Sequence, residues 1–151
     1  MILISIYPEY VDEIKKGIKK YEFRKGFSKK RRSKLISQRY VAVYESMPRS
    51  FITLIFKIGK IYEDDIFNIW EKFGNQSGIT KDYFFGYYHG RNRGVAIQIK
   101  DFFILKNPIT LKEIRKNYPK FIPPQNFYQL SEEKYPLLYQ KLKKEILRRK
   151  F

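Results

Sequence analysis

The stretch of sequence that decides the fold is Gly17-Ile18-Lys19-Lys20-Tyr21-Glu22-Phe23-Arg24. Charged and aromatic side chains alternate in it, and such alternation is typical of a β-strand, in which successive side chains point to opposite faces. We therefore predict a strand over residues 19–24. The strand is expected to direct Tyr21 and Phe23 into the core, to hold Lys19 at its mouth, and to carry Lys20, Glu22 and Arg24 on the other face. Glu22 would then pair with cations that keep it ionised.

The segments on either side of this strand predict a mixture of strands and helices. Residues 2–6 favour a buried strand, and Pro8 suits the first turn of a helix that Gly17 ends. Residues 25–37 are polar and basic, and we expect an exposed loop there. Other patterns predict strands over residues 40–44, 51–62, 95–99 and 102–105, and helices over residues 66–73, after Thr80, over residues 110–117 and near the C-terminus. Strands that outnumber helices without strict alternation indicate an α+β fold with a largely antiparallel sheet.

The net charge is strongly positive. The 151 residues include 32 Lys and Arg against 15 Asp and Glu, which gives a formal net charge of +17, and the pI is about 9.9. The charge is clustered, because residues 11–40 hold 12 basic and 3 acidic side chains and residues 140–151 hold 6 and 1. Clustered basic residues and a pI above about 9 are typical of a nucleic-acid binder. The alternatives are a charge that only maintains solubility and a charge that speeds association with an acidic protein.

The composition narrows the class of protein further. A chain with 43% hydrophobic and 31% charged residues is typical of a soluble globular domain. The chain has no cysteine, which excludes disulfides and thiolate metal sites. Its apolar runs are the length of strands and its N-terminus has no basic n-region, so we expect neither a membrane span nor a signal peptide. We expect a cytoplasmic, monomeric protein.

Residues 17–24 fit the pattern G-x-K-x-x-E-x-R after a strand and a Pro-started helix, and in this setting they resemble the signature of the ASCH family. Other stretches resemble the family in order and spacing, and together they cover roughly residues 1–130. They are Ile4-Ser5-Ile6-Tyr7-Pro8-Glu9-Tyr10, Tyr44-Glu45-Ser46-Met47-Pro48, Ile69-Trp70-Glu71-Lys72-Phe73-Gly74, Gly78-Ile79-Thr80-Lys81, Ala96-Ile97-Gln98-Ile99 and Pro123-Pro124-Gln125-Asn126-Phe127.

The resemblance implies a PUA-like, mostly antiparallel, closed or nearly closed β-barrel of about five to six strands with peripheral helices. It also implies RNA binding in a groove beside residues 17–24. We expect this domain to span residues 1–130, and a basic amphipathic helix over residues 131–151 to pack on it through Leu138, Leu142 and Ile146. RNA is the expected partner and DNA is the alternative. We expect no cofactor and no membrane association.

The expected groove combines cations, aromatic faces and amides. Lys and Arg hold phosphates, while a carboxylate such as Glu22 accepts hydrogen bonds from a base edge or a sugar hydroxyl. Aromatic rings stack on splayed bases. The basic run over residues 29–34 is expected to contact phosphate, with a nuclear address and a solvated loop as alternatives. The predicted nucleic-acid-binding residues are Lys19, Glu22, Arg24, Lys29, Lys30, Arg31, Arg32, Lys34, Tyr44, Ser46, Arg49, Gln125 and Phe127.

Non-catalytic RNA binding is the leading expectation, and a hydrolase acting on RNA or on a modified nucleoside is the alternative. The resemblance includes relatives that remove an acetyl group from modified cytidine and relatives linked to RNA cleavage. Lys19 and Glu22 are then the catalytic candidates. Lys19 would act as a base if its pKa were depressed, and Glu22 as its acid or base partner. The deacetylating relatives have a Thr nucleophile at the position of Glu22. This chain lacks that hydroxyl.

Other catalytic signals are weaker. The acidic run Glu63-Asp64-Asp65 offers ligands that suit Mg²⁺. Acidic residues are also typical of the first turn of a helix, and we favour that interpretation. His89 is the only histidine, and with no cysteine beside it we expect no transition-metal site.

Overall fold

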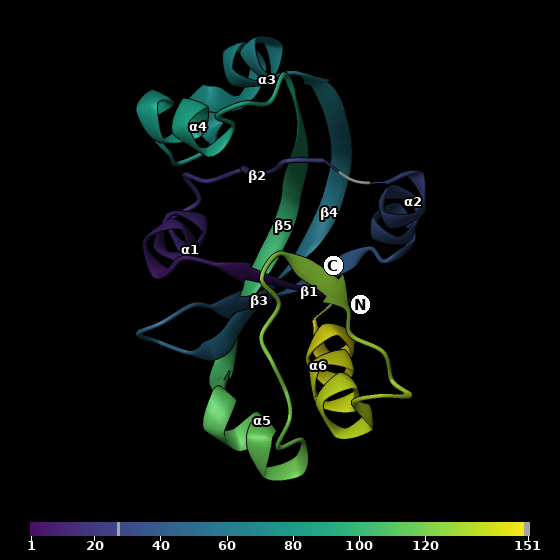
Figure 1. Ribbon diagram of the computed structural model, residues 1–151. Coiled ribbons are helices and arrows are strands. Elements are labelled where there is room, and N and C mark those ends of the chain that lie inside the picture. The colour runs from purple at the N-terminus through teal and green to yellow at the C-terminus, as the bar shows by residue number, and fades with distance from the viewer. Residues whose placement is uncertain (27, 150–151) are drawn as a thin grey trace. The chain divides into compact units, whose positions relative to one another are not determined.

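The computed structural model describes residues 1–26 and 28–149 (Figure 1). Both strands and helices are present, which confirms the predicted α+β class. No helix within these residues is long and apolar enough to cross a membrane. The strands are β1 (Ile2–Ile6), β2 (Tyr21–Arg24), β3 (Tyr40–Glu45), β4 (Phe51–Asp65), β5 (Arg93–Thr110) and β6 (Phe127–Gln129); the helices are α1 (Pro8–Lys15), α2 (Lys29–Ser37), α3 (Ile66–Phe73), the 3₁₀ helix η1 (Gly74–Gln76), α4 (Lys81–Tyr87), α5 (Leu111–Asn117) and α6 (Pro136–Arg148).

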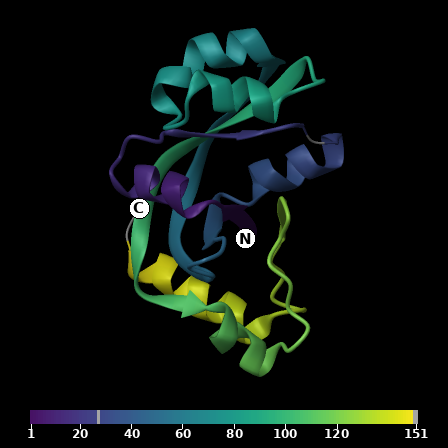
Figure 2. The same cartoon turned by 60° about the vertical axis from the view of Figure 1, so that its left-hand side comes forward.

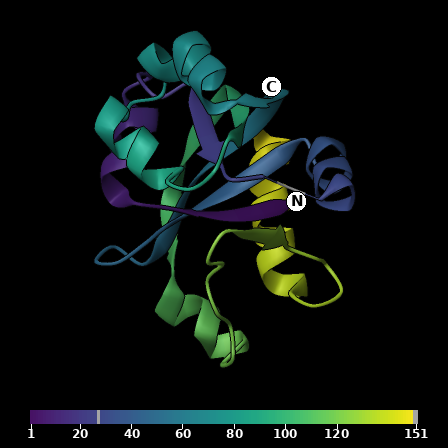
Figure 3. The same ribbon diagram turned by 45° about the horizontal axis from the view of Figure 1, so that its top comes forward.

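The strands form one six-stranded sheet in the order β2-β5-β4-β3-β1-β6. β1 and β3 are parallel, whereas the pairs β1–β6, β2–β5 and β3–β4 are antiparallel. The predicted number of strands is therefore confirmed, in a mixed sheet. Figure 3 shows the three-residue strand β6, which the sequence did not predict, beside β1.

The chain divides into two compact units, and each unit collects separate segments of the sequence. Unit 1 consists of Met1–Pro8, Gln38–Lys57 and Asp101–Phe151, and unit 2 consists of Glu9–Ser37 and Ile58–Lys100. The long strands β4 and β5 contribute residues to both units. Each unit has a hydrophobic core of its own.

The core of unit 1 joins residues of β1, β3, β4, β5, α5 and α6. Leu138 and Leu142 of α6 are 5% and 0% exposed, and Ile146 packs against the same cluster. Helix α6 lies beside α5 (Figure 2), where the backbone N–H of Leu137 donates to the Tyr118 hydroxyl at 2.9 Å. The apolar stripe predicted for the C-terminal helix thus contacts the core of unit 1.

The core of unit 2 contains the aromatic residues of β2, which pairs with the first part of β5. Tyr21 and Phe23 are 9% and 5% exposed, so their predicted burial is confirmed. Helices α3 and α4 lie close together (Figure 1) and contribute Ile69 and Phe84, which are fully buried in the same cluster. Burial of Tyr21 and Phe23 fixes β2 in the sheet.

Side-chain caps begin three helices where the sequence predicts helix starts. Thr80 and Thr110 each accept a hydrogen bond from the backbone N–H three residues on, at 3.2 and 3.1 Å. Asp65 Oδ1 accepts from the backbone N–H of Phe67 at 2.8 Å and caps α3. Such caps contribute about 1 kcal/mol each. Asp65, the last residue of the acidic run, therefore caps a helix. This agrees with the interpretation that the run marks a helix start.

Two predictions of local structure are wrong. Residues 29–37 form α2 rather than a loop, because Lys and Arg have good helix propensity, Ser28 accepts a hydrogen bond from the Arg31 N–H at 3.3 Å, and Leu35 is buried at 1% exposure. The strands predicted over residues 95–99 and 102–105 are one continuous strand, β5. Only Lys100 and Asp101 lie between those two runs, and neither Gly nor Pro interrupts the strand.

We predict that Leu142→Ala destabilises the protein by about 2–5 kcal/mol, because it leaves a cavity in the core of unit 1. Leu147→Ala removes the same atoms from the same helix at a side chain that is 73% exposed, and it should change the free energy of unfolding by no more than about 0.5 kcal/mol. Urea denaturation measures both. Equal effects of the two changes would show that α6 contributes nothing to the core.

Candidate functional site

Three charged side chains on β2 and just before it form a buried ion-paired group, the Lys19–Glu22–Arg24 cluster. Lys19 Nζ lies 3.2 Å from Glu22 Oε2, and Arg24 Nη2 lies 2.9 Å from Glu22 Oε1. The three residues are 3%, 8% and 8% exposed. Charges withdrawn from water are tolerated in a protein when they are paired and hydrogen-bonded. Glu22 meets that requirement with both carboxylate oxygens.

The Lys19 amine is also held by the loop that follows η1. Lys19 Nζ donates to the carbonyl oxygen of Ser77 at 2.8 Å, and it lies 5.9 and 5.8 Å from the ring centroids of Tyr10 and Phe23. The neighbouring backbone N–H of Lys20 donates to the carbonyl oxygen of Gln76 at 2.7 Å. These contacts fix the amine between a carboxylate, a carbonyl and two aromatic rings.

Burial shifts the protonation equilibrium of this amine. Desolvation lowers the pKa of Lys19 below its ordinary value, and the facing carboxylate of Glu22 raises it again in part. Because the pKa is lowered, a larger fraction of this amine is neutral at a given pH than for a lysine in water. A lowered pKa is the property that suits a lysine to proton transfer.

Tyr88 anchors the other end of β2. Its hydroxyl donates to the carbonyl oxygen of Arg24 at 2.7 Å, and burial raises the pKa of this hydroxyl. Gly94 packs directly on the Tyr88 ring, because a Cβ at Gly94 would lie 2.6–2.7 Å from three atoms of that side chain. Arg24 is therefore positioned through its backbone as well as through Glu22.

The lysine that pairs with Glu22 differs from the one that strand alternation indicates. Alternation places Lys20 beside Glu22, yet Lys19 makes the ion pair and Lys20 is exposed. The cause is that β2 begins at Tyr21, so residues 19 and 20 lie before the strand and do not follow its alternation. The sequence did single out Lys19, Glu22 and Arg24, and the structure brings these three together.

The predicted basic run forms the exposed face of α2 in unit 2. Arg32 Nη1 lies 2.8 Å from Glu63 Oε2, whereas the other four cations are exposed. The buried side chain of this helix is Leu35. The cations of α2 are Lys29, Lys30, Arg31, Arg32 and Lys34.

The remaining predicted contacts lie in unit 1. Tyr44 is 4% exposed and belongs to the core of that unit. Ser46 is half-buried in the turn after β3, and Arg49 Nη1 lies 2.7 Å from Glu45 Oε2. Gln125 is exposed and Phe127 is half-buried. Phe127 pairs opposite Ile4 in the ladder between β1 and β6.

No sequence pattern singled out Glu45, Ser77 or Tyr88, although each contacts a predicted residue. Glu45 is fully buried on β3, and its spacing of four from Arg49 is the signal that could have found that pair. The role of Ser77 depends on its backbone carbonyl, which any residue carries. Tyr88 was indistinguishable from the other aromatic residues near α4.

The carboxylates of residues 63–65 have separate partners. Glu63 pairs with Arg32, Asp64 lies 3.4 Å from Lys72 Nζ and accepts from the Asn68 amide at 3.2 Å, and Asp65 caps α3. The hydrogen bond from Asn68 is the main reason why the pKa of Asp64 is lowered. Among residues 1–26 and 28–149, no group of three His, Cys, Asp or Glu side chains is arranged to hold a metal ion.

Comparison with known proteins finds the same family that the sequence resembles. The model of the ASCH domain matches residues 4–111. A relative from Zymomonas mobilis, described as an ASCH domain-containing ribonuclease, is 26% identical over 133 residues, which are 87% of this chain and 84% of the relative.

Solved structures support the same fold. The crystal structure of ASCH from Zymomonas mobilis superposes with a TM-score of 0.79 at 22% identity, over 92% of this chain and 93% of that one. The N-terminal domain of Staphylothermus marinus McrB gives a TM-score of 0.58 at 13% identity, over 92% of each chain. At these identities the likeness concerns the fold alone.

We predict that Glu22→Gln lowers the free energy of unfolding by about 3–5 kcal/mol, because it removes the carboxylate shared by two buried cations. The matched control is Glu13→Gln. Glu13 also pairs with a lysine three residues away at 3.2 Å, but that lysine, Lys16, is 62% exposed, so the control should cost no more than about 1 kcal/mol. Equal effects in urea denaturation would contradict the burial of the cluster.

Proposed function

Because the chain belongs to the ASCH domain family, we propose that it binds single-stranded RNA and cleaves it. The first support is the relative described as a ribonuclease, which favours the hydrolase alternative over the non-catalytic binding that the sequence analysis preferred. The second is the net charge of +17, which attracts a polyanion. The third is the Lys19–Glu22–Arg24 cluster, and this observation carries the proposal.

The cluster provides the groups that phosphodiester cleavage needs. A lysine with a lowered pKa beside a carboxylate is suited to proton transfer, and a guanidinium forms charge-assisted hydrogen bonds to phosphate oxygens. In our proposal Lys19 and Glu22 handle the protons and Arg24 binds the reacting phosphate. Tyr88 and the Ser77 carbonyl act as positioning groups, because their contacts hold Arg24 and Lys19 in place.

RNA removes the need for a protein nucleophile. This chain has Glu22 where the deacetylating relatives are expected to have a Thr hydroxyl, whereas every ribose in RNA has a 2′-hydroxyl next to a phosphodiester. In the proposed step a base removes the 2′-hydroxyl proton, the 2′-oxygen attacks phosphorus, and the bond from phosphorus to the 5′-oxygen breaks. The 5′-oxygen takes up a proton. The products are a 2′,3′-cyclic phosphate and a 5′-hydroxyl.

Helix α2 is proposed to bind the phosphates of the RNA backbone. Lys29, Lys30, Arg31 and Lys34 present positive charge on an exposed helical face, and such side chains fix a nucleic acid through its phosphates without reading its sequence. The proposed RNA contacts in unit 1 are Ser46, Arg49, Gln125 and Phe127. Tyr44 is not among them, because it is 4% exposed and belongs to the core of that unit.

We predict that purified protein cleaves a labelled, unstructured RNA and that Lys19→Gln reduces the cleavage rate roughly 10²- to 10⁴-fold, the usual contribution of a general acid or base. Lys16→Gln, which removes an exposed lysine of the same N-terminal segment, should leave the rate unchanged. Reactions are run with Mg²⁺, with Mn²⁺ and with EDTA, and a thermal melt checks that each variant is folded.

Substrates separate the proposed chemistry from its rivals. Replacing one ribose by deoxyribose should abolish cleavage at that nucleotide, and the product ends should be a cyclic phosphate and a 5′-hydroxyl. RNA that is bound but never cleaved would favour the non-catalytic function instead. Release of acetate from acetylated cytidine, abolished in Lys19→Gln, would assign the protein to the deacetylating branch.

We predict that replacing Lys29, Lys30, Arg31 and Lys34 together by Gln weakens RNA binding and makes its salt dependence shallower. The log–log slope of affinity against salt should fall in magnitude by about 0.7 for each phosphate that the variant no longer neutralises. The control replaces an equal number of exposed lysines in unit 1, namely Lys112, Lys116, Lys143 and Lys144. Fluorescence anisotropy at several salt concentrations measures both, and identical slopes would refute a specific role for α2.

A further inference from the structure

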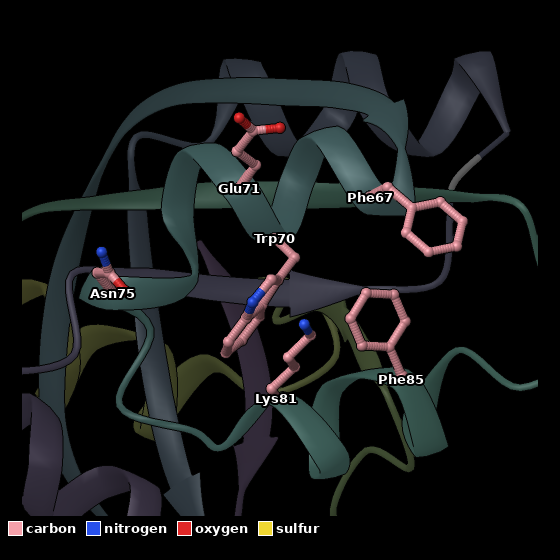
Figure 4. A pocket seen from close by; sticks show the side chains of 6 residues that line it. All are labelled: Phe67, Trp70, Glu71, Asn75, Lys81 and Phe85. Carbon is pink, nitrogen blue, oxygen red and sulfur yellow. The ribbon is translucent and has the colours of Figure 1, made fainter.

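Unit 2 contains a second candidate site, a hollow between α3 and α4 (Figure 4). It has a volume of about 610 Å³, within the usual range of ligand pockets. Helix α3 contributes residues spaced so that they share one side of the helix, and the rest come from η1 and α4. The lining residues are Phe67, Trp70, Glu71, Asn75, Lys81 and Phe85.

The aromatic residues of the hollow lie at the edge of the core of unit 2, because Trp70 and Phe85 are half-buried and pack against it. Helix α3 already buries Ile66, Ile69 and Phe73, whereas Phe67 is 66% exposed. Phe67 and Phe85 nevertheless gather there, with ring centroids 5.3 Å apart. Phe67 is exposed and Trp70 and Phe85 are half-buried, and such a group of accessible aromatic rings is typical of a binding surface.

The indole of Trp70 is held in one orientation. Its centroid lies 5.1 Å from that of Phe84, which is fully buried. Gly74 lies against the indole, since a Cβ there would be only 2.6–2.8 Å from three of its ring atoms. The backbone of Gly74 has φ −55° and ψ −43°, a conformation open to any residue, so glycine is required there for space. A ring fixed in this way loses little entropy when a ligand stacks on it.

The polar side chains of the hollow are available to bind a ligand. Within the part of the chain that the structure describes, the side chains of Glu71, Asn75 and Lys81 make no hydrogen bond or ion pair. The Lys81 amine points to the space between Trp70 and Phe85 (Figure 4). The hollow thus offers one fixed indole, two further aromatic rings beside it, and a cation that can bind a phosphate.

We infer that this hollow binds one unstacked nucleobase of a single-stranded RNA, with the base against Trp70 and Lys81 on a neighbouring phosphate. The inference rests on the proposed RNA function and adds a second contact, away from the chemistry of the Lys19–Glu22–Arg24 cluster. Stacking on an aromatic ring tolerates any base, because every base has a π-face. The site therefore contributes affinity and strand position rather than sequence preference.

Trp70 is the only tryptophan, so its fluorescence reports on this hollow alone. The probe is a short oligouridylate with methylated 2′-hydroxyls, which blocks the proposed cleavage and keeps the strand intact. Titration should quench Trp70 with the same Kd that anisotropy gives. Phe67→Ala removes a ring that lines the hollow beside Phe85 but keeps the indole, so it should weaken binding by less than the roughly 5- to 150-fold that loss of one stacked base causes. Its side chain is exposed, so this variant should fold normally, and a thermal melt checks that it does.

Two further variants test the charge and the geometry. Lys81→Gln should weaken binding more than Lys72→Gln, which removes the same charge from α3 at a lysine paired with Asp64 outside the hollow. Gly74→Ala should shift Trp70 emission and reduce the quench without changing any other lining side chain. RNA cleavage of the natural substrate is measured in parallel for every variant.

The outcomes separate this inference from the proposed function. Quenching without any cleavage of RNA by the wild-type protein supports the hollow and refutes the ribonuclease. The hollow is not a base site if RNA is bound and cleaved while Trp70 emission stays unchanged and Lys81→Gln and Lys72→Gln have equal effects. In that case its aromatic surface is assigned to a protein partner. Absence of RNA binding refutes both.

Discussion

The burial of one carboxylate between two cations is the constraint on which unit 2 depends. Glu22 can be charged at 8% exposure because every oxygen has a cationic partner, and Lys19 in turn needs the Ser77 carbonyl. That last contact requires the backbone to turn sharply after η1. Gly78 permits it with φ +67°, a conformation that favours glycine, and a Cβ there would lie a tight 3.0 Å from the Cβ of Lys19. A glycine far along the chain is thus needed for the charge balance of β2.

The features that could be predicted from sequence are those governed by local rules. Alternation indicated that Tyr21 and Phe23 face the core, and cap chemistry indicated where α4 and α5 begin. Each of these depends on a few neighbouring residues, so one window of sequence contains the information. The family resemblance, carried by residues 17–24, supplied the rest of the fold class, which composition and periodicity alone do not contain.

The features that could not be predicted depend on tertiary contacts. Helix α2 forms from a polar, basic segment because Leu35 has a place in the interior, and nothing in the segment itself indicates that place. Strand β6 has only three residues and exists through its pairing with β1. For the site, the pattern selected Lys19, Glu22 and Arg24, but the choice of Lys19 over Lys20 follows from where β2 starts. The Ser77 carbonyl has no sequence signal at all.

The interleaving of the two units has a consequence for the order in which the chain matures on the ribosome. Unit 2 has all of its segments once residue 100 has been synthesised, whereas unit 1 still lacks everything from Asp101 onward. Until then β1 can pair with β3, but β6 has not yet been made. The unpaired edge of β1 can therefore form hydrogen bonds with a strand of another chain. Closing unit 1 requires the first and last parts of the chain to meet, which is the slow, non-local step of folding. The nascent protein therefore passes through a stage in which the unit that carries the buried charge cluster is complete and the other unit is still being made.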